Sequence, residues 1–84
     1  MTYEVVLSSR ATRDLDRFVG RPHERLLAAI QALADNPRPP LCTKLTGSDE
    51  WRIRVGDYRI RYLIDDSART VAITRIAHRK DVYR

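Results

Sequence analysis

The chain has 84 residues, of which 43% are hydrophobic, and a formal net charge of +5. This length suits one domain with a small core, spanning residues 1–84, and the hydrophobic content excludes global disorder. One cysteine, Cys42, excludes an intramolecular disulfide and an all-cysteine zinc site, and the two histidines lack a carboxylate cluster, so we expect no metal and no cofactor. There is no apolar run of membrane-spanning length and no signal-peptide pattern, so we expect a cytoplasmic protein with no membrane partner.

The first third of the chain predicts a strand followed by a helix. Residues 2–8 alternate in polarity, which is typical of a strand with one buried face. Ser8 and Ser9 can cap a helix that begins near position 10 and that we expect to end at Gly20. Apolar residues recur at helical spacing in this segment, and Asp14 falls on its predicted solvent side.

A second helix and a proline-rich connector follow. Pro22 suits the first helical turn, where its missing N–H costs nothing, and an apolar stripe continues to the connector at residues 36–40. Because few residues separate the two helices, they must fold back as an antiparallel hairpin.

The second half of the chain predicts three strands. Residues 51–55 place apolar side chains at odd positions and arginines at even ones, and the alternation resumes at residues 58–64 after the Gly56–Asp57 turn. Residues 71–76 are β-branched toward both faces, which predicts a central strand. The predicted fold class is α+β: a strand, an antiparallel helical hairpin and a three-stranded antiparallel meander, forming one small twisted sheet with the helices on one face.

The positive charge is concentrated in the predicted sheet. Residues 1–40 hold six basic against five acidic side chains, whereas residues 41–84 hold ten against six, and fourteen of the sixteen basic residues are arginine. Arginine favours two-pronged contacts with phosphate. If residues 51–64 pair as a hairpin with their apolar faces aligned, four guanidinium groups share one face, which indicates a polyanionic partner: Arg52, Arg54, Arg59 and Arg61.

Three motifs in this order resemble the RelE/ParE superfamily of bacterial toxins over essentially the whole chain: Lys44-Leu45-x-Gly47, the hairpin 51–62 and His78-Arg79-x-x-Val82-Tyr83-Arg84. The resemblance implies a toxin of a type II toxin–antitoxin pair, with a fold similar to microbial ribonucleases and a cognate antitoxin protein as partner. RelE-like members enter the ribosomal A site and cut mRNA. ParE-like members poison DNA gyrase and do not cut RNA.

The resemblance also implies roles for particular residues. RelE-like enzymes place basic residues on the strand before the glycine turn, where this chain has Arg52 and Arg54 although the best-known members carry lysines. An arginine after the turn matches Arg59, one after the last strand matches Arg79, and a near-terminal tyrosine matches Tyr83. The set favours a ribosome-dependent mRNA endonuclease (mRNA interferase), with ribosome and mRNA as partners and no small-molecule substrate. A ParE-like gyrase poison is the alternative, and a degenerate member that binds only its antitoxin stays open.

Cleavage of RNA without a metal uses the 2′-OH as nucleophile and needs charge stabilisation and proton transfer. Clustered guanidinium groups suit the first need. Together with this argument, the resemblance implies that Arg54, Arg59, Arg79 and Tyr83 are catalytic. Arginine, with a pKa above about 12, is a poor base, so His78 is a candidate acid or base, unless the ribosome or the RNA supplies that group. The remaining basic side chains are expected to bind RNA: Arg52, Arg61, Lys44 and Lys80.

Each of these assignments has a structural alternative. The aromatic residues Trp51, Tyr58 and Tyr62 share the apolar side of the hairpin and are expected in the core. Arg61 and Arg75 could instead form ion pairs on the sheet with Asp57, Asp65 or Asp66. His78 could be an idle surface residue.

Overall fold

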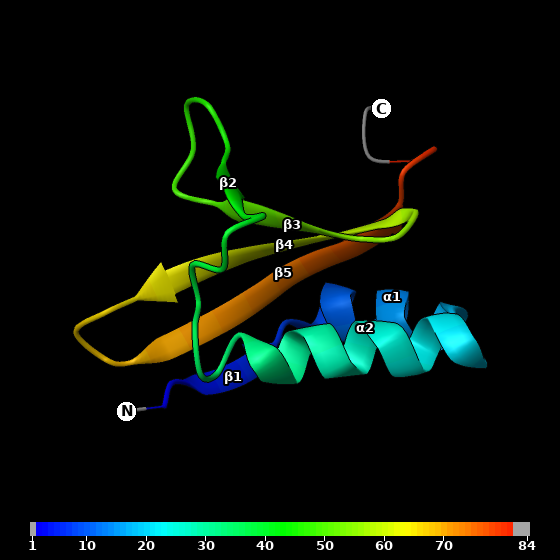
Figure 1. Ribbon diagram of the computed structural model, residues 1–84, viewed down its shortest axis with the longest axis horizontal. Coiled ribbons are helices and arrows are strands. Elements are labelled where there is room, and N and C mark those ends of the chain that lie inside the picture. The colour runs from blue at the N-terminus through cyan, green and yellow to red at the C-terminus, as the bar shows by residue number, and fades with distance from the viewer. Residues whose placement is uncertain (1, 82–84) are drawn as a thin grey trace.

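The computed structural model describes residues 2–81 and arranges them as one five-stranded sheet with two helices on one side (Figure 1). The strands are β1 (Glu4–Leu7), β2 (Thr43–Lys44), β3 (Trp51–Val55), β4 (Tyr58–Asp65) and β5 (Thr70–His78). Their order in the sheet is β1-β5-β4-β3-β2, with β1 parallel to β5 and the other pairs antiparallel. The predicted α+β class is confirmed. β2 is an addition, and β5 is an interior strand beside the central β4.

The two helices follow the expected order, but the first one ends earlier than predicted. Helix α1 (Ser9–Arg17) begins after Ser8, whose hydroxyl accepts the Ala11 N–H at 3.0 Å, as the sequence predicts. It ends before Gly20, which has φ +73° and instead precedes helix α2 (Arg21–Ala32). The prediction that Gly20 caps the first helix is therefore wrong: the chain leaves α1 earlier and uses the glycine to turn into α2.

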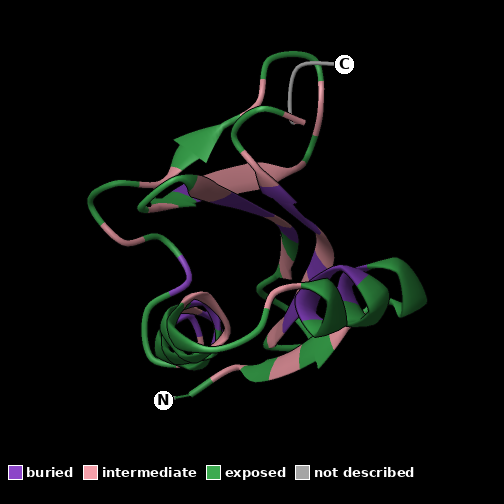
Figure 2. Cartoon of the chain, turned by 90° about the vertical axis from the view of Figure 1, so that its right-hand side faces the viewer, coloured by how far each residue is buried: buried purple, intermediate pink, exposed green. Residues whose placement is uncertain are grey.

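The core lies between the sheet and the two helices, where the buried segments of Figure 2 face one another. Tyr62 is fully buried, and its hydroxyl donates a hydrogen bond to the Pro37 carbonyl at 2.8 Å, which fixes the proline-rich connector over the sheet. Burial raises the pKa of the Tyr62 phenol above its ordinary value. Among residues 2–81, no helix has the length and apolarity needed to cross a membrane. The core side chains come from both layers: Ala11, Leu15, Leu26, Ile30, Leu33, Ile53, Ile60, Tyr62, Val71, Ile73 and Ile76.

The β3–β4 hairpin has the predicted register. Ile53 pairs with Ile60 on the core face, and Gly56 takes φ +60° in the two-residue turn. On the other face the arginines stand directly opposite one another, as Arg52 with Arg61 and Arg54 with Arg59.

A β-bulge interrupts the pairing of β4 with β5. Arg61 pairs with Arg75, whereas the next residue, Tyr62, pairs with Ile73, so Thr74 is the extra residue. Because of this bulge, Arg75 faces the same side of the sheet as Arg61 while Tyr62 and Ile73 both reach the core. The arginine row therefore extends across three strands.

Candidate functional site

Five arginines share the sheet face opposite the core, which confirms the clustering predicted from the hairpin and adds one member from β5. Cross-strand partners lie on the same face of a sheet with their Cβ atoms about 4.5–5.5 Å apart. We call this set the arginine face: Arg52, Arg54, Arg59, Arg61 and Arg75.

Arg59 has the most constrained side chain of the arginine face. It is only 8% exposed, and its Nη1 donates to the carbonyl oxygens of Gly56 and Tyr58 at 3.2 and 3.0 Å. Its Nε is buried and has no hydrogen-bond acceptor among residues 2–81. A buried, oriented guanidinium with an unused donor is suited to bind an anion, because an unsatisfied buried donor is costly until an acceptor arrives.

Arg79 lies at the same end of the sheet, directly after β5. Its backbone N–H donates to the Asp57 carbonyl at 2.7 Å, and its Nε lies 3.8 Å from Asp57 Oδ1. The end of β5 is thereby held against the β3–β4 turn, next to Arg59. Arg79 and Arg54 are both exposed. The structure thus brings Arg54, Arg59 and Arg79 together around one turn.

The ion pairs of the arginine face differ from those considered from the sequence. Arg61 binds the half-buried Glu50 carboxylate, which also accepts the Thr74 hydroxyl, and Arg75 Nε lies 3.7 Å from Asp14 Oδ2. Neither pairs with Asp57, Asp65 or Asp66. Glu50 and Asp14 thus partly compensate the charges of Arg61 and Arg75. At the β3–β4 turn, the only ion pair within residues 2–81 joins Arg79 to the exposed Asp57.

The other predicted residues are spread more widely. His78 is the cross-strand partner of Tyr58 and packs edge-on against its ring at 5.3 Å, so it lies on the side of the sheet away from Arg59. His78 Nδ1 accepts the Lys80 N–H at 3.2 Å, and Lys80 is exposed. Lys44 is exposed on the edge strand β2, two strands from β4. Tyr83 lies outside the described residues.

The three aromatic residues of the hairpin, all expected in the core, differ in burial. Tyr62 is in the core, as expected. Trp51 and Tyr58 are half-buried: Trp51 carries the Arg38 guanidinium over its ring at 5.2 Å, and Tyr58 packs edge-on against Phe18 at 4.8 Å.

Arg25 is a basic residue at this site that sequence reasoning missed. A Cβ added to Gly56 would come within 3.0 Å of Arg25 Nη2, so this guanidinium from α2 lies directly against the β3–β4 turn. From the sequence, only the apolar stripe of this helix was considered. One feature of the sequence could have indicated this position. Arg25 directly precedes Leu26, which faces the core, and a residue at the border of the buried helix face can reach a neighbouring turn of the sheet.

The family described as ParE toxin of type II toxin-antitoxin system, parDE, matches residues 5–83. The toxin RelG of Mycobacterium tuberculosis is 38% identical over 92 aligned residues, which cover 100% of this chain and 99% of RelG. The chain belongs to the RelE/ParE family of type II toxins.

Solved structures agree with this family assignment. The RelBE2 toxin–antitoxin complex of M. tuberculosis contains a chain with a TM-score of 0.85 and 28% identity, covering 93% of this chain and 99% of that one. The archaeal RelE–RelB complex of Pyrococcus horikoshii gives a TM-score of 0.84 and 26% identity, covering 98% and 100%. These relatives of the toxin were thus solved together with an antitoxin.

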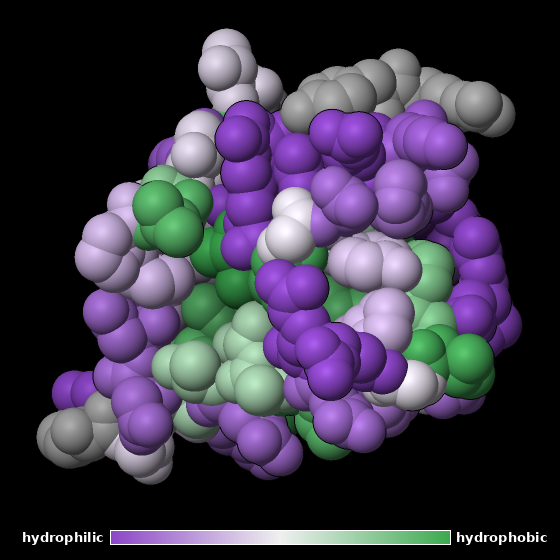
Figure 3. Space-filling model, turned by 45° about the vertical axis from the view of Figure 1, so that its right-hand side comes forward, coloured by the Kyte–Doolittle hydropathy of each residue, from purple (hydrophilic) through white to green (hydrophobic). Residues whose placement is uncertain are grey.

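An apolar groove borders the arginine face of this toxin. It encloses about 350 Å³ between α2, the proline-rich connector and β3, and Arg54 forms part of its wall. Figure 3 shows this hollow, with hydrophobic side chains inside it and hydrophilic ones along its upper rim. Leu41 is 76% exposed at the groove. Residues 2–81 contain no group of three or more His, Cys, Asp or Glu side chains that could hold a metal ion.

Proposed function

We propose that this toxin is a ribosome-dependent mRNA endonuclease that cleaves by metal-independent attack of the RNA 2′-OH and thereby inhibits translation. The observation that supports it best is Arg59, a buried guanidinium fixed by two carbonyl groups with its Nε unpaired within the described chain. Exposed Arg54 and Arg79 flank it at the same turn. An enzyme of this kind acts where ribosomes are, so the proposal includes a cytoplasmic location.

The reaction needs stabilisation of negative charge more than any other contribution. O2′ forms a bond to phosphorus, the bond from phosphorus to O5′ breaks, the 2′-OH proton passes to a base and O5′ takes up a proton. Negative charge grows on the non-bridging oxygens in between, and preorganised cations aimed at that charge are usually the largest catalytic contribution. We assign this role to Arg59 and Arg79, with Arg54 contacting the same phosphate group. Arg52, Arg61, Lys44 and Lys80 are proposed to bind flanking phosphates.

Proton transfer has fewer candidates. His78 Nδ1 accepts the Lys80 N–H, so in the neutral ring the proton is on Nε2 and the basic nitrogen is occupied. As a base for O2′, His78 must give up this hydrogen bond. As an acid for O5′, it must first take up a second proton, which also breaks the bond to Lys80, and in both roles the ring must turn away from Tyr58. Tyr83 is retained as a proposed acid or stacking residue, and the base is proposed to come from the ribosome or the RNA.

Primer extension on a translated mRNA, with and without ribosomes, tests the proposal. We expect the wild-type toxin to give cuts only with ribosomes, and Arg59→Ala and Arg79→Ala each to reduce cleavage about 100-fold or more. Because Arg59 is buried, Arg79→Ala and the charge-conserving Arg59→Lys are included as variants less prone to unfold. Arg13→Ala, on the exposed side of α1, is the matched control and should cut like wild type. Wild-type cleavage rates in both Arg59→Ala and Arg79→Ala would refute the proposed site.

The alternative is a gyrase poison, which is favoured by the ParE description of the matching family. A supercoiling assay separates the two functions, because a gyrase poison inhibits supercoiling and leaves mRNA uncut. Inhibition of gyrase at toxin concentrations that cut no mRNA would overturn the nuclease proposal.

We further propose that a cognate antitoxin covers the site from the apolar groove. The groove offers the half-buried Ala29 and the exposed Leu41 to a hydrophobic segment, and Arg54 in its wall offers a charge to an acidic one. An antitoxin segment in this groove therefore lies against the arginine face. Hydrogen exchange with and without the antitoxin should show slowed exchange in β3 and the end of α2; unchanged exchange there would place the partner elsewhere.

A further inference from the structure

Helix α1 carries a second arginine cluster, organised by the buried Asp14. Asp14 is 1% exposed, although its position in the helical pattern predicted the solvent side. Its Oδ2 accepts the backbone N–H of Ile76 at 2.9 Å. The reason lies in the sheet edge: β1 ends at Leu7, so within residues 2–81 β5 has no strand neighbour beyond Ile73 on that side, and Asp14 takes over as acceptor.

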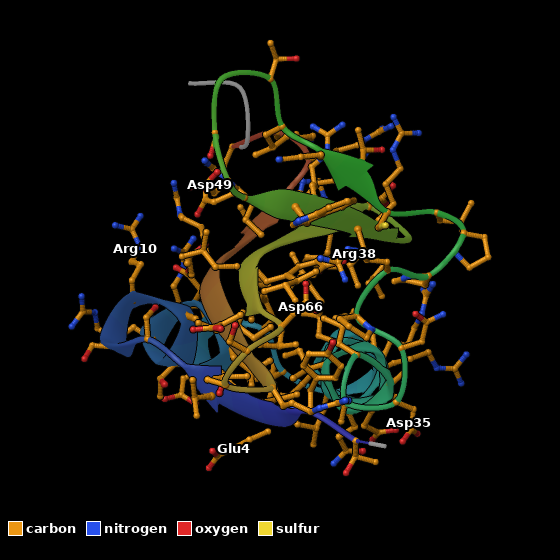
Figure 4. All side chains as sticks on the ribbon, turned by 90° about the vertical axis from the view of Figure 1, so that its left-hand side faces the viewer. Glu4, Arg10, Asp35, Arg38, Asp49 and Asp66 are labelled. Atoms are coloured by element: carbon orange, nitrogen blue, oxygen red, sulfur yellow. The ribbon has the colours of Figure 1, made fainter. Side chains whose placement is uncertain are left out.

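Three guanidinium groups surround this one carboxylate. Arg10 Nε lies 3.2 Å from Oδ1, Arg17 Nη1 lies 3.9 Å from it, and Arg75 Nε lies 3.7 Å from Oδ2. The side chains of Arg10 and Arg17 are 52% and 61% exposed, and Figure 4 shows Arg10 extending from α1 into open solvent. Since three positive charges face one negative charge, the cluster retains a surplus of two that water and anions can reach.

This cluster is continuous with the arginine face. Arg75 belongs to both, because it contacts Asp14 and is the cross-strand partner of Arg61. The Nε atoms of Arg61 and Arg75 are buried and have no hydrogen-bond acceptor within residues 2–81. Positively charged donors therefore run from the β3–β4 turn, across β5, to the exposed side of α1.

We propose that Arg10, Arg17 and Arg75, held in place by Asp14, form a second phosphate-binding surface that contacts the phosphodiester backbone of RNA outside the cleavage site. This rests on the proposed function, because the nuclease supplies the reason for an RNA partner. Arginine presents a planar fork that matches phosphate geometry, and Asp14 restricts two flexible side chains before binding. Asp14 is a positioning residue, and the three arginines touch the RNA.

Binding measurements with charge-matched variants test this surface. The double variant Arg10→Ala/Arg17→Ala removes two charges from the cluster, and Arg13→Ala/Arg21→Ala removes two from exposed positions that are not paired with Asp14. Fluorescence anisotropy with a labelled single-stranded RNA and an RNA duplex, and sedimentation with ribosomes, give affinity at several salt concentrations. For the first variant we expect about three- to tenfold weaker binding and a salt slope reduced by about 1.4 to 1.8, the value for two lost phosphate contacts. The control should keep the wild-type slope.

The outcomes separate the surface from the proposed function. If Arg10→Ala/Arg17→Ala weakens binding to duplex RNA and to ribosomes but not to the single strand, ribosomal RNA is the ligand. If it weakens binding to the single strand, the message is the ligand. Both results support the surface. Equal losses of RNA affinity in the two double variants would mean that only the net charge matters. Unchanged affinity in both variants would mean that the surface does not bind RNA. Each of these results overturns the proposal. In cleavage assays, the first variant should raise KM and leave kcat unchanged. A toxin that cuts no mRNA yet shows the binding difference refutes the nuclease but keeps the surface.

Discussion

Asp14 connects helix and sheet through a single carboxylate. It is nearly inaccessible to water, yet it accepts a backbone N–H from β5 and faces three arginines, so its removal leaves Ile76 N–H without an acceptor and Arg75 without its counter-charge. Such losses are costly because the partners stay in place after the carboxylate is gone.

We predict that Asp14→Ala lowers the free energy of unfolding by about 2–3 kcal/mol. Asp14→Asn keeps an oxygen for the Ile76 N–H and should lose less, about half as much, because only the charge is removed. Urea denaturation followed by circular dichroism measures both. Asp16→Ala, at an exposed position of the same helix, is the control and should change stability by less than about 0.5 kcal/mol. A similar loss in Asp14→Ala and Asp16→Ala would contradict the structural role of Asp14.

At single residues, the sequence predicted which face of an element a side chain occupies but not how deeply it is buried. Period-two alternation correctly predicted which arginines share a face, because it depends only on strand geometry. It could not predict that Arg59 is buried while Arg54 beside it is exposed, since that depends on how the turn folds around the side chain. Asp14 was missed for a related reason: helical periodicity marks polar residues as solvent-facing, and only the tertiary structure reveals an unpaired sheet edge beside the helix.

At the level of elements, the sequence predicted those with a long repeating pattern. Both helices and the three long strands lie where their periodicity indicated. β2 has two residues, which is too short for any period, and it forms because β3 offers a free edge. Gly20 was placed correctly as a turn but was assigned to the wrong helix, because a positive φ serves the end of one helix and the approach to the next equally well. The bulge at Thr74 left no recognisable signal in the sequence.

Across the whole molecule, a polar network joins segments that are distant in sequence at the end of the sheet opposite the β3–β4 turn. Asp66, after β4, accepts the Tyr3 hydroxyl at 2.6 Å and forms two hydrogen bonds with Arg38 of the connector. Figure 4 shows Arg38 and Asp66 approaching each other from these two segments. Arg38 in turn stacks over Trp51, and Arg69 lies over the Tyr3 ring at 5.7 Å. The network ties the start of the chain and the connector to the sheet, on the far side from the candidate site.

The network makes stability depend on pH in a defined window. Hydrogen bonds from Arg38 and Tyr3 lower the pKa of the Asp66 carboxyl from 3.8 to about 2, and the hydrogen bond to Asp66 raises the pKa of the Tyr3 phenol. A carboxyl whose folded pKa is lowered stabilises the fold while it is ionised. Its contribution is complete above the unfolded pKa and is lost as the pH falls toward the folded pKa.

We therefore predict that Asp66→Asn is less stable than wild type at neutral pH and that the difference disappears with acidification. The gap in unfolding free energy should be constant above about pH 5 and should shrink toward pH 2, as the wild-type carboxyl takes up its proton. Because these side chains are exposed, added salt should narrow the gap at neutral pH as well. Urea titrations at a series of pH values measure it, with Asp49→Asn in the exposed loop before β3 as the control. A gap that stays the same at pH 2 and pH 7 would show that Asp66 acts through packing, because its charge is then irrelevant to the stability that it provides.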